Sequence, residues 1–189
     1  MNFINLSFKW VGVLSPRTKT KHIVLHHRGG NGDIMSIHQD HISDKGWLGI
    51  GYHFYIRKDG RIYSGRPIDT IGAHSVGANN ISIGVCFEGN FEKEDMNDTQ
   101  IKAGQRLISY LRGLYPDVSI KKHNDFEQTA CPGKNFPFNR IKEGERNMTV
   151  EEAIRIIKEK AGLEAETMTF LNCYKYSEAL LIKLAKAMV

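Results

Sequence analysis

The sequence predicts an α/β protein in which helices flank a mixed central β-sheet, with a small helical appendage at the C-terminus. Two observations carry this prediction. Apolar, strand-like runs alternate with helical periodicity as far as about residue 142, and only helical patterns follow Arg146. The 189 residues suffice for one domain with a packed core but are few for two full domains. We therefore expect a first domain over residues 1–147 and a small helical domain over residues 148–189.

The first two predicted elements are a strand and a helix. Residues 22–27 (HIVLHH) form a short apolar run with the pattern of a central strand. Successive side chains on a strand point to opposite faces, so only one of His26 and His27 can reach a given site. Residues 34–45 place apolar side chains on one helical face, and Gly46 is the expected helix stop.

The next predicted elements are a hairpin, a strand and the clearest helix of the first domain. Residues 52–63 hold two apolar strands around a Lys-Asp-Gly turn, and residues 81–87 form another apolar strand. Asn97 and Gln100 then form a capping-box pattern at the start of a helix that Pro116 ends. Strands alternating with helices over one core predict the mixed sheet.

A last short strand is predicted at residues 118–120, where it delivers His123 into the loop at 124–132. Cys131 lies in this loop, eight positions after His123. His26, His123 and Cys131 are therefore candidate metal ligands, since a catalytic zinc typically takes three protein ligands and leaves a fourth position for water. The spacing alone is weak evidence, because no compact helical motif joins the two histidines.

The tail changes to a purely helical pattern. Thr149 and Glu152 form a second capping box, the helix that follows ends at Gly162, and a further helix is expected from about Ser177. Two short amphipathic helices seldom fold alone. We expect them to pack on the first domain, on another copy of the chain or on a wall ligand, with a wall-binding or self-association role; the alternative is a lid that only stabilises the first domain.

The formal net charge of +5 falls on the first domain, because residues 148–189 hold six basic and six acidic residues. A basic surface suits any polyanion, including nucleic acid, anionic membranes or a bacterial wall, and does not choose among them. No helix combines a dense basic face with a DNA-reading motif, so we expect no nucleic-acid partner.

Three cysteines, Cys86, Cys131 and Cys173, are an odd number spread far apart, which argues against a disulfide framework and leaves a thiolate free to act as a ligand. No stretch approaches the roughly 18 consecutive apolar residues of a membrane helix, and the first 17 residues lack a basic head followed by an apolar run. We expect no membrane insertion, and synthesis in the cytoplasm without a signal peptide.

Five sequence blocks occur in a characteristic order: His26 on its strand, GYHF at 51–54, GAHS at 72–75, SIGV at 82–85 and TACPG at 129–133. With these blocks in register, the chain resembles the type-2 N-acetylmuramoyl-L-alanine amidases, whose relatives include peptidoglycan-recognition proteins and short phage endolysins. The resemblance covers roughly residues 20–142. It implies the amidase and peptidoglycan-recognition fold.

The resemblance implies one zinc ion per chain, held by His26, His123 and Cys131. It also implies hydrolysis of the amide between the lactyl group of N-acetylmuramic acid and the first L-alanine of the stem peptide. Zinc can lower the pKa of a bound water to about 7 and polarise a carbonyl, which suits amide hydrolysis. The same two imidazoles and thiolate would also accept cobalt or another soft divalent ion.

Tyr52, Thr129 and His74 are the further candidate catalytic residues. Tyr52 matches the family's tyrosine near the metal, where a phenol can hydrogen-bond the water or the developing oxyanion; the alternative is a half-buried strand aromatic. Thr129 stands where some phage members carry a lysine, so it offers one neutral donor in place of a cation. His74 could contact substrate or protonate the leaving amine, or it is a loop histidine held only by hydrogen bonds. Because Cys86 stands where another branch has a glutamate, the general base has no assignment.

The leading functional hypothesis is a phage or prophage endolysin that lyses bacterial cell walls and is released through a holin-type pore. Bacterial peptidoglycan is then the partner, and the sequence gives no signal for the oligomeric state. The alternative is a peptidoglycan-recognition module that binds the muropeptide without cutting it. Relatives of that type commonly lack one metal ligand, whereas all three positions are filled here.

Overall fold

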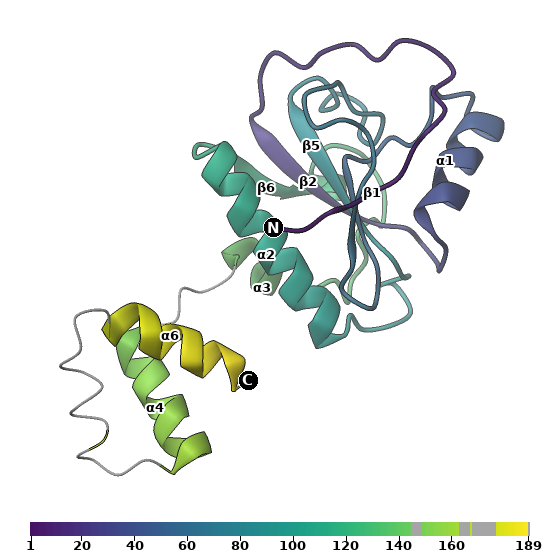
Figure 1. Ribbon diagram of the computed structural model, residues 1–189. Coiled ribbons are helices and arrows are strands. Elements are labelled where there is room, and N and C mark those ends of the chain that lie inside the picture. Colours follow the sequence, from purple (N-terminus) through teal and green to yellow (C-terminus); the bar gives the residue numbers. More distant parts are fainter. Residues whose placement is uncertain (145–148, 163–166, 168–176, 189) are drawn as a thin grey trace. The chain divides into compact units, whose positions relative to one another are not determined.

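The computed structural model describes residues 1–144, 149–162, 167 and 177–188. The chain divides into two compact units, Met1–Glu145 and Arg146–Val189 (Figure 1). The predicted domain boundary at 147/148 and Cys173 lie outside the described residues.

A six-stranded mixed sheet forms the centre of the first unit, in the order β1-β4-β3-β5-β2-β6. The pair β3–β4 is antiparallel and the other neighbouring pairs are parallel. The predicted fold class, a mixed sheet with flanking helices, is confirmed. The strand bounds are Ile4–Asn5 (β1), His22–His27 (β2), Phe54–Ile56 (β3), Ile62–Ser64 (β4), Ser82–Phe87 (β5) and Ser119–Lys122 (β6).

Helices cover both faces of this sheet (Figure 1). One hydrophobic cluster joins α2 (Asp98–Leu114) and α3 (Phe138–Glu143) to the sheet, and a second joins α1 (Ile34–Ser43) to it. On β2, Ile23 and Leu25 belong to the first cluster, so His26 faces the opposite side, toward the α1 layer. In the described part of the chain, no helix is long and apolar enough to span a membrane.

The start of α2 differs in one respect from its prediction. Asn97 caps the helix, because its side chain accepts a hydrogen bond from the backbone N–H of Gln100 at 2.9 Å. The Gln100 side chain, however, is fully buried and donates to the carbonyl oxygens of Ile56 at 3.1 Å and Glu88 at 2.9 Å. The capping-box prediction was therefore wrong in its second half, since buried carbonyl groups next to the strand ends require a donor.

Strand β2 lies between β5 and β6, and its register sets the geometry of the functional site. His26 is opposite Cys86 on β5, while Leu25 is opposite Lys122, the last residue of β6. His26 and His123 therefore follow directly after two paired residues on neighbouring parallel strands. The two histidines are 97 positions apart in sequence, yet they lie at the ends of neighbouring strands.

The second unit consists of two helices, α4 (Val150–Ala161) and α6 (Ser177–Ala187). The predicted capping box at Thr149 and Glu152 is present, and Gly162 ends α4 in the left-handed conformation with φ of 60°. The two helices share a small buried core of Ala153, Ile157, Leu181 and Ala185.

Candidate metal centre

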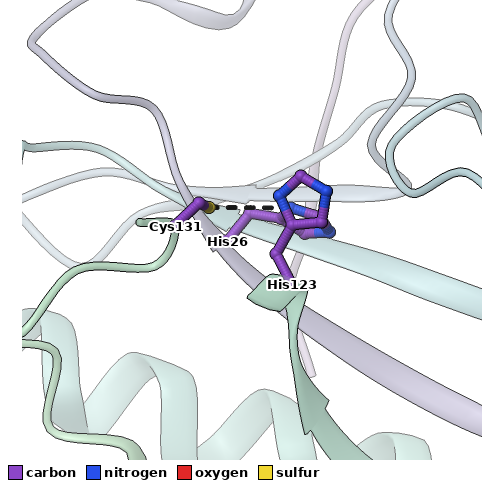
Figure 2. Close-up of side chains that lie close together, drawn as sticks. All are labelled: His26, His123 and Cys131. Carbon is purple, nitrogen blue, oxygen red and sulfur yellow. Dashed lines mark hydrogen bonds between the residues drawn. The ribbon is translucent and has the colours of Figure 1, made fainter. Parts of the chain in front are cut away.

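Three side chains from separate elements converge beside the sheet (Figure 2). His26 lies on β2, His123 begins the 3-10 helix η1 (His123–Asp125) directly after β6, and Cys131 lies in the loop that follows. One ligand atom from each of the three lies within 4.8 Å of the others. These are the three residues predicted to bind metal, and the structure brings all of them together.

His26 is fully buried, and both of its ring nitrogens face polar groups. Its Nδ1 lies 3.9 Å from the sulfur of Cys131, and its Nε2 lies 3.0 Å from Nδ1 of His74. Burial, together with the neighbouring histidines His74, His123 and His27, holds the pKa of His26 well below its usual value. The ring is therefore neutral at pH 7, which is the form that binds metal.

His27 points away from this site, as expected for the next residue on a strand. Its Nδ1 accepts a hydrogen bond from the backbone N–H of Phe91 at 3.1 Å. The structure thus selects His26 over His27 as the residue that faces the candidate metal centre.

The second histidine, His123, lies against His26 with ring centroids 4.4 Å apart. Its Nε2 is 2.9 Å from a carboxylate oxygen of Glu127, four residues later. This contact leaves Nδ1 as the ring nitrogen available for a metal.

Cys131 is partly buried, and its sulfur accepts a hydrogen bond from the backbone N–H of His27 at 3.4 Å. Burial raises the pKa of the Cys131 thiol to about 12, a shift that the His27 N–H opposes and the charge of Glu127 reinforces. Without metal the side chain is therefore a thiol at pH 7. Metal binding requires the thiolate and would release this proton.

One of the three side chains, His123, lines a cavity of about 350 Å³ that also has Tyr52 and His74 in its wall. The Tyr52 ring centroid lies 5.2 Å from that of His26. Burial, with smaller effects of Cys86 and Cys131, raises the pKa of Tyr52 well above its usual value, so the phenol stays a hydrogen-bond donor. The remaining lining residues are His41, Lys45, Trp47, Ala73, Ser75, Val76, Asn79 and Glu127.

His74 and Thr129 make hydrogen bonds within the protein. His74 is buried, contacts His26 as described above, and packs over Gly84, where an added Cβ would come within 2.5 Å of its ring. Burial holds the pKa of His74 well below its usual value, so the ring is neutral. The Thr129 hydroxyl accepts a hydrogen bond from the backbone N–H of Cys131 at 3.2 Å. These contacts favour the alternative in which His74 is held by hydrogen bonds.

Two further residues of the cavity wall have roles that the sequence did not indicate. Glu127 is one of them. It follows His123 by four residues, but the segment has no helical periodicity that would indicate a contact between the two side chains. The second residue is His41. It lies in the cavity wall, its Nδ1 accepts from the backbone N–H of Gly51 at 3.0 Å, and its ring packs against Trp47 and Tyr52.

Comparisons with known proteins agree with this architecture. Residues 16–134 match the family described as N-acetylmuramoyl-L-alanine amidase. An endolysin of Enterobacteria phage K11 is 37% identical over 118 residues, which are 59% of this chain and 76% of the endolysin. The structure of the N-acetylmuramoyl-L-alanine amidase LysC from Clostridium intestinale URNW is 40% identical, with a TM-score of 0.73, and the match covers 76% of this chain and 96% of LysC.

A structural match also exists to a protein that has been solved with a peptidoglycan fragment. Peptidoglycan recognition protein-LE in complex with tracheal cytotoxin, a monomeric diaminopimelic acid-type peptidoglycan, is 28% identical with a TM-score of 0.67. The match covers 75% of this chain and 92% of that protein. The fold is therefore shared with proteins named as enzymes and with one named as a recognition protein.

The fold and these matches show that the protein is an amidase, an enzyme that hydrolyses an amide bond. Within that class, the chain belongs to the N-acetylmuramoyl-L-alanine amidase family. The family and the enzyme class predicted from the sequence are confirmed. The matches thus support the function of a peptidoglycan amidase for this chain.

Proposed function

We propose that the protein hydrolyses the amide between N-acetylmuramic acid and L-alanine in bacterial peptidoglycan with one zinc ion bound by His26, His123 and Cys131. The observation that carries this proposal is the convergence of three ligand atoms within 4.8 Å, one of them from His123 in the wall of a 350 Å³ cavity, in a chain of the amidase family. The donor set fits zinc, which binds imidazole and thiolate in sites that keep one position open.

The residues around this site have distinct proposed roles. When bound, zinc supplies a Lewis acid and lowers the pKa of a water molecule. Tyr52, kept neutral by burial, donates its phenol proton as a hydrogen bond to the developing oxyanion. Thr129 accepts from the backbone of the ligand Cys131, and His74 holds His26, so both support the site. The general base has no assignment.

We propose further that the protein acts as an endolysin of a phage or prophage and reaches the wall through a holin-type pore. The similarity to the endolysin of phage K11 supports this role. The alternative is a recognition module that binds the muropeptide without cutting it. The similarity to peptidoglycan recognition protein-LE supports this alternative. The complete set of three candidate ligands favours the enzyme.

Chelator-sensitive cleavage tests the proposed activity directly. Purified peptidoglycan digested with the protein is expected to release stem peptides with a newly freed L-alanine amine, detected by mass spectrometry. Prior treatment with a chelator should stop the release, and added zinc should restore it. Binding of muropeptide without release, from several wall types, would instead support the recognition module.

Residues 148–189 are proposed to form a small helical domain for wall binding or self-association. Its described core of four buried side chains is small, and domains of this size usually need further stabilisation from a partner. Intermolecular or wall contacts would provide it.

A chain ending at Asn147 tests this proposal. Compared with the full chain, the shortened protein is expected to pellet less with insoluble peptidoglycan, or to form particles with fewer chains in solution. Cleavage of a soluble muropeptide serves as the control and should persist. Unchanged wall binding together with an unchanged monomeric state would contradict the proposal.

A further inference from the structure

One short loop, residues 73–79, is linked to both candidate metal-binding histidines. His74 in this loop lies 3.0 Å from Nε2 of His26. Two residues later, the backbone N–H of Val76 donates at 2.5 Å to the same Glu127 oxygen that lies 2.9 Å from Nε2 of His123. The loop is therefore linked directly to one histidine and, through Glu127, to the other.

On the His26 side, the contacts define which ring nitrogen carries the proton. The Ser82 hydroxyl donates to the carbonyl oxygen of Ala78 at 2.6 Å, so Ser82 must accept from Nε2 of His74 across 3.4 Å. Nδ1 of His74 is then an acceptor, and His26 donates to it from Nε2. This chain leaves the lone pair of His26 Nδ1 facing Cys131 (Figure 2).

On the His123 side, Glu127 has the corresponding effect. A carboxylate only accepts hydrogen bonds, so in the neutral His123 ring Nε2 carries the proton and Nδ1 keeps its lone pair. The neutral tautomer that can bind a metal through Nδ1 is thus selected at both histidines. A carboxylate that accepts from the second nitrogen also makes a ligating imidazole more basic.

The loop itself is held firmly enough to support this task. The Asn79 side-chain oxygen accepts from the backbone N–H groups of His74 at 2.7 Å and Ser75 at 2.9 Å. The His74 ring rests on Gly84, which leaves no room for a Cβ. The positions of His74 and of the Val76 N–H are therefore fixed relative to β5.

We propose that Glu127 is a positioning residue of the metal centre, which orients His123 and ties it through Val76 to the loop that orients His26. This inference rests on the proposed zinc site. Loss of such a partner of a ligating histidine typically weakens metal binding about 10–100-fold. Glu127 contacts a ligand and not the reacting atoms, so its effect should appear in metal affinity as well as in turnover.

Zinc affinity of the full chain, measured by competition with a chromophoric chelator, tests this role. Glu127→Ala is expected to weaken zinc binding about 10–100-fold. Glu127→Gln, whose amide oxygen can still accept from His123, should lose less. Asp98→Asn is the matched control. It removes one carboxylate from a mostly exposed ion pair between Asp98 on α2 and Arg140 on α3, and it should bind zinc as the wild type does.

Nitrogen NMR of the metal-free histidine rings provides the second measurement. The wild-type His123 ring should show the single tautomer protonated at Nε2, and Glu127→Ala should show a mixture of both tautomers. Should Glu127→Ala fail to fold, Glu127→Gln carries the comparison, with a smaller zinc affinity and a shifted His123 signal expected.

Three outcomes separate the two proposals. Zinc affinity and His123 signals that are unchanged in the folded Glu127 variants would overturn the role of Glu127 while leaving the zinc site standing. A wild-type chain that binds no zinc would overturn the metal site and this inference together. Weaker binding in Asp98→Asn as well would show a general charge effect and would also overturn the inference.

Discussion

Replacement of Cys131 by serine is expected to abolish zinc-dependent cleavage while leaving the fold intact. Cys131 supplies the only thiolate among the three candidate ligands. Loss of a hydrogen-bond partner of a metal ligand typically costs up to about 100-fold in activity. Loss of the ligand Cys131 itself should therefore reduce turnover by more than about 100-fold. The measurement is release of free L-alanine amines from peptidoglycan with zinc present.

The same substitution should have little effect on the metal-free fold. The Cys131 side chain is only partly buried, and a serine hydroxyl can accept the same hydrogen bond from the His27 N–H. We expect the free energy of unfolding of the metal-free protein to change by less than about 1 kcal/mol. Added zinc should raise the melting temperature of the wild type and not that of Cys131→Ser, because only a ligand bound to the folded state stabilises it.

Cys86→Ser is the matched control for this experiment. Cys86 is fully buried in the hydrophobic cluster beneath α1, so a hydroxyl there should lower the melting temperature. Zinc should still stabilise this variant. Full, chelator-sensitive activity in Cys131→Ser would contradict the assignment of Cys131 as a ligand.

The strands and helices of the first unit could be predicted because their patterns are local. Strand β5 is buried along its whole length and appears in the sequence as a mostly apolar run. The start of α2 follows from Asn97 and its apolar spacing. Gln100 differed from its prediction because its side chain pairs with carbonyl groups brought to it by the folded sheet, which no local pattern records.

The candidate metal centre depends on pairings that are distant in sequence. The adjacency of His26 and His123 follows from the register of β2 against β6, and neither strand's own residues specify that neighbour. The resemblance to the amidases that these sequence blocks carry, and not the spacing, identified the candidate ligands. No such block contained Glu127, so its contact with His123 became visible only in the structure.

Acid is expected to destabilise the metal-free protein from about pH 6.5 downward, a range in which most carboxylates still carry their charge. His53 is one of the buried histidines responsible. It is almost fully buried, its Nδ1 accepts from the backbone N–H of Gly84 at 3.0 Å, and its Nε2 lies 2.9 Å from the carbonyl oxygen of Thr70. Burial lowers the pKa of His53 to about 3, opposed by the Thr70 contact and reinforced by Arg17 and Arg66.

The direction of the effect follows from proton uptake by the two states. The unfolded chain protonates this histidine near pH 6.5, whereas the folded protein does not until about pH 3. Between these values the unfolded state binds more protons, so the free energy of unfolding falls as the pH falls. At about 1.4 kcal/mol per pKa unit the loss is at most about 5 kcal/mol, a large share of the stability of a typical domain.

Other histidines act in the same direction and set the background. Burial lowers the pKa of His41 to about 4 and holds those of His26 and His74 well below their usual values. Although burial opposes the shift, hydrogen bonds from Arg57 and from the backbone lower the pKa of Glu88. Glu88 therefore reduces the free energy of unfolding only when the pH falls below the ordinary pKa of a glutamic acid. The contribution of His53 must therefore be obtained as a difference between two proteins.

His53→Asn isolates that difference, because the asparagine oxygen can accept from the Gly84 N–H but does not titrate. Urea unfolding of both proteins at several pH values between 7.5 and 4, with a chelator present, gives the two slopes. We expect the variant to be less stable at pH 7.5, since its shorter side chain gives up the contact with Thr70. Its free energy of unfolding should nevertheless fall less steeply below pH 6.5 than that of the wild type. Parallel slopes would mean that His53 is protonated equally in the folded and unfolded states, and would exclude it as a source of acid sensitivity.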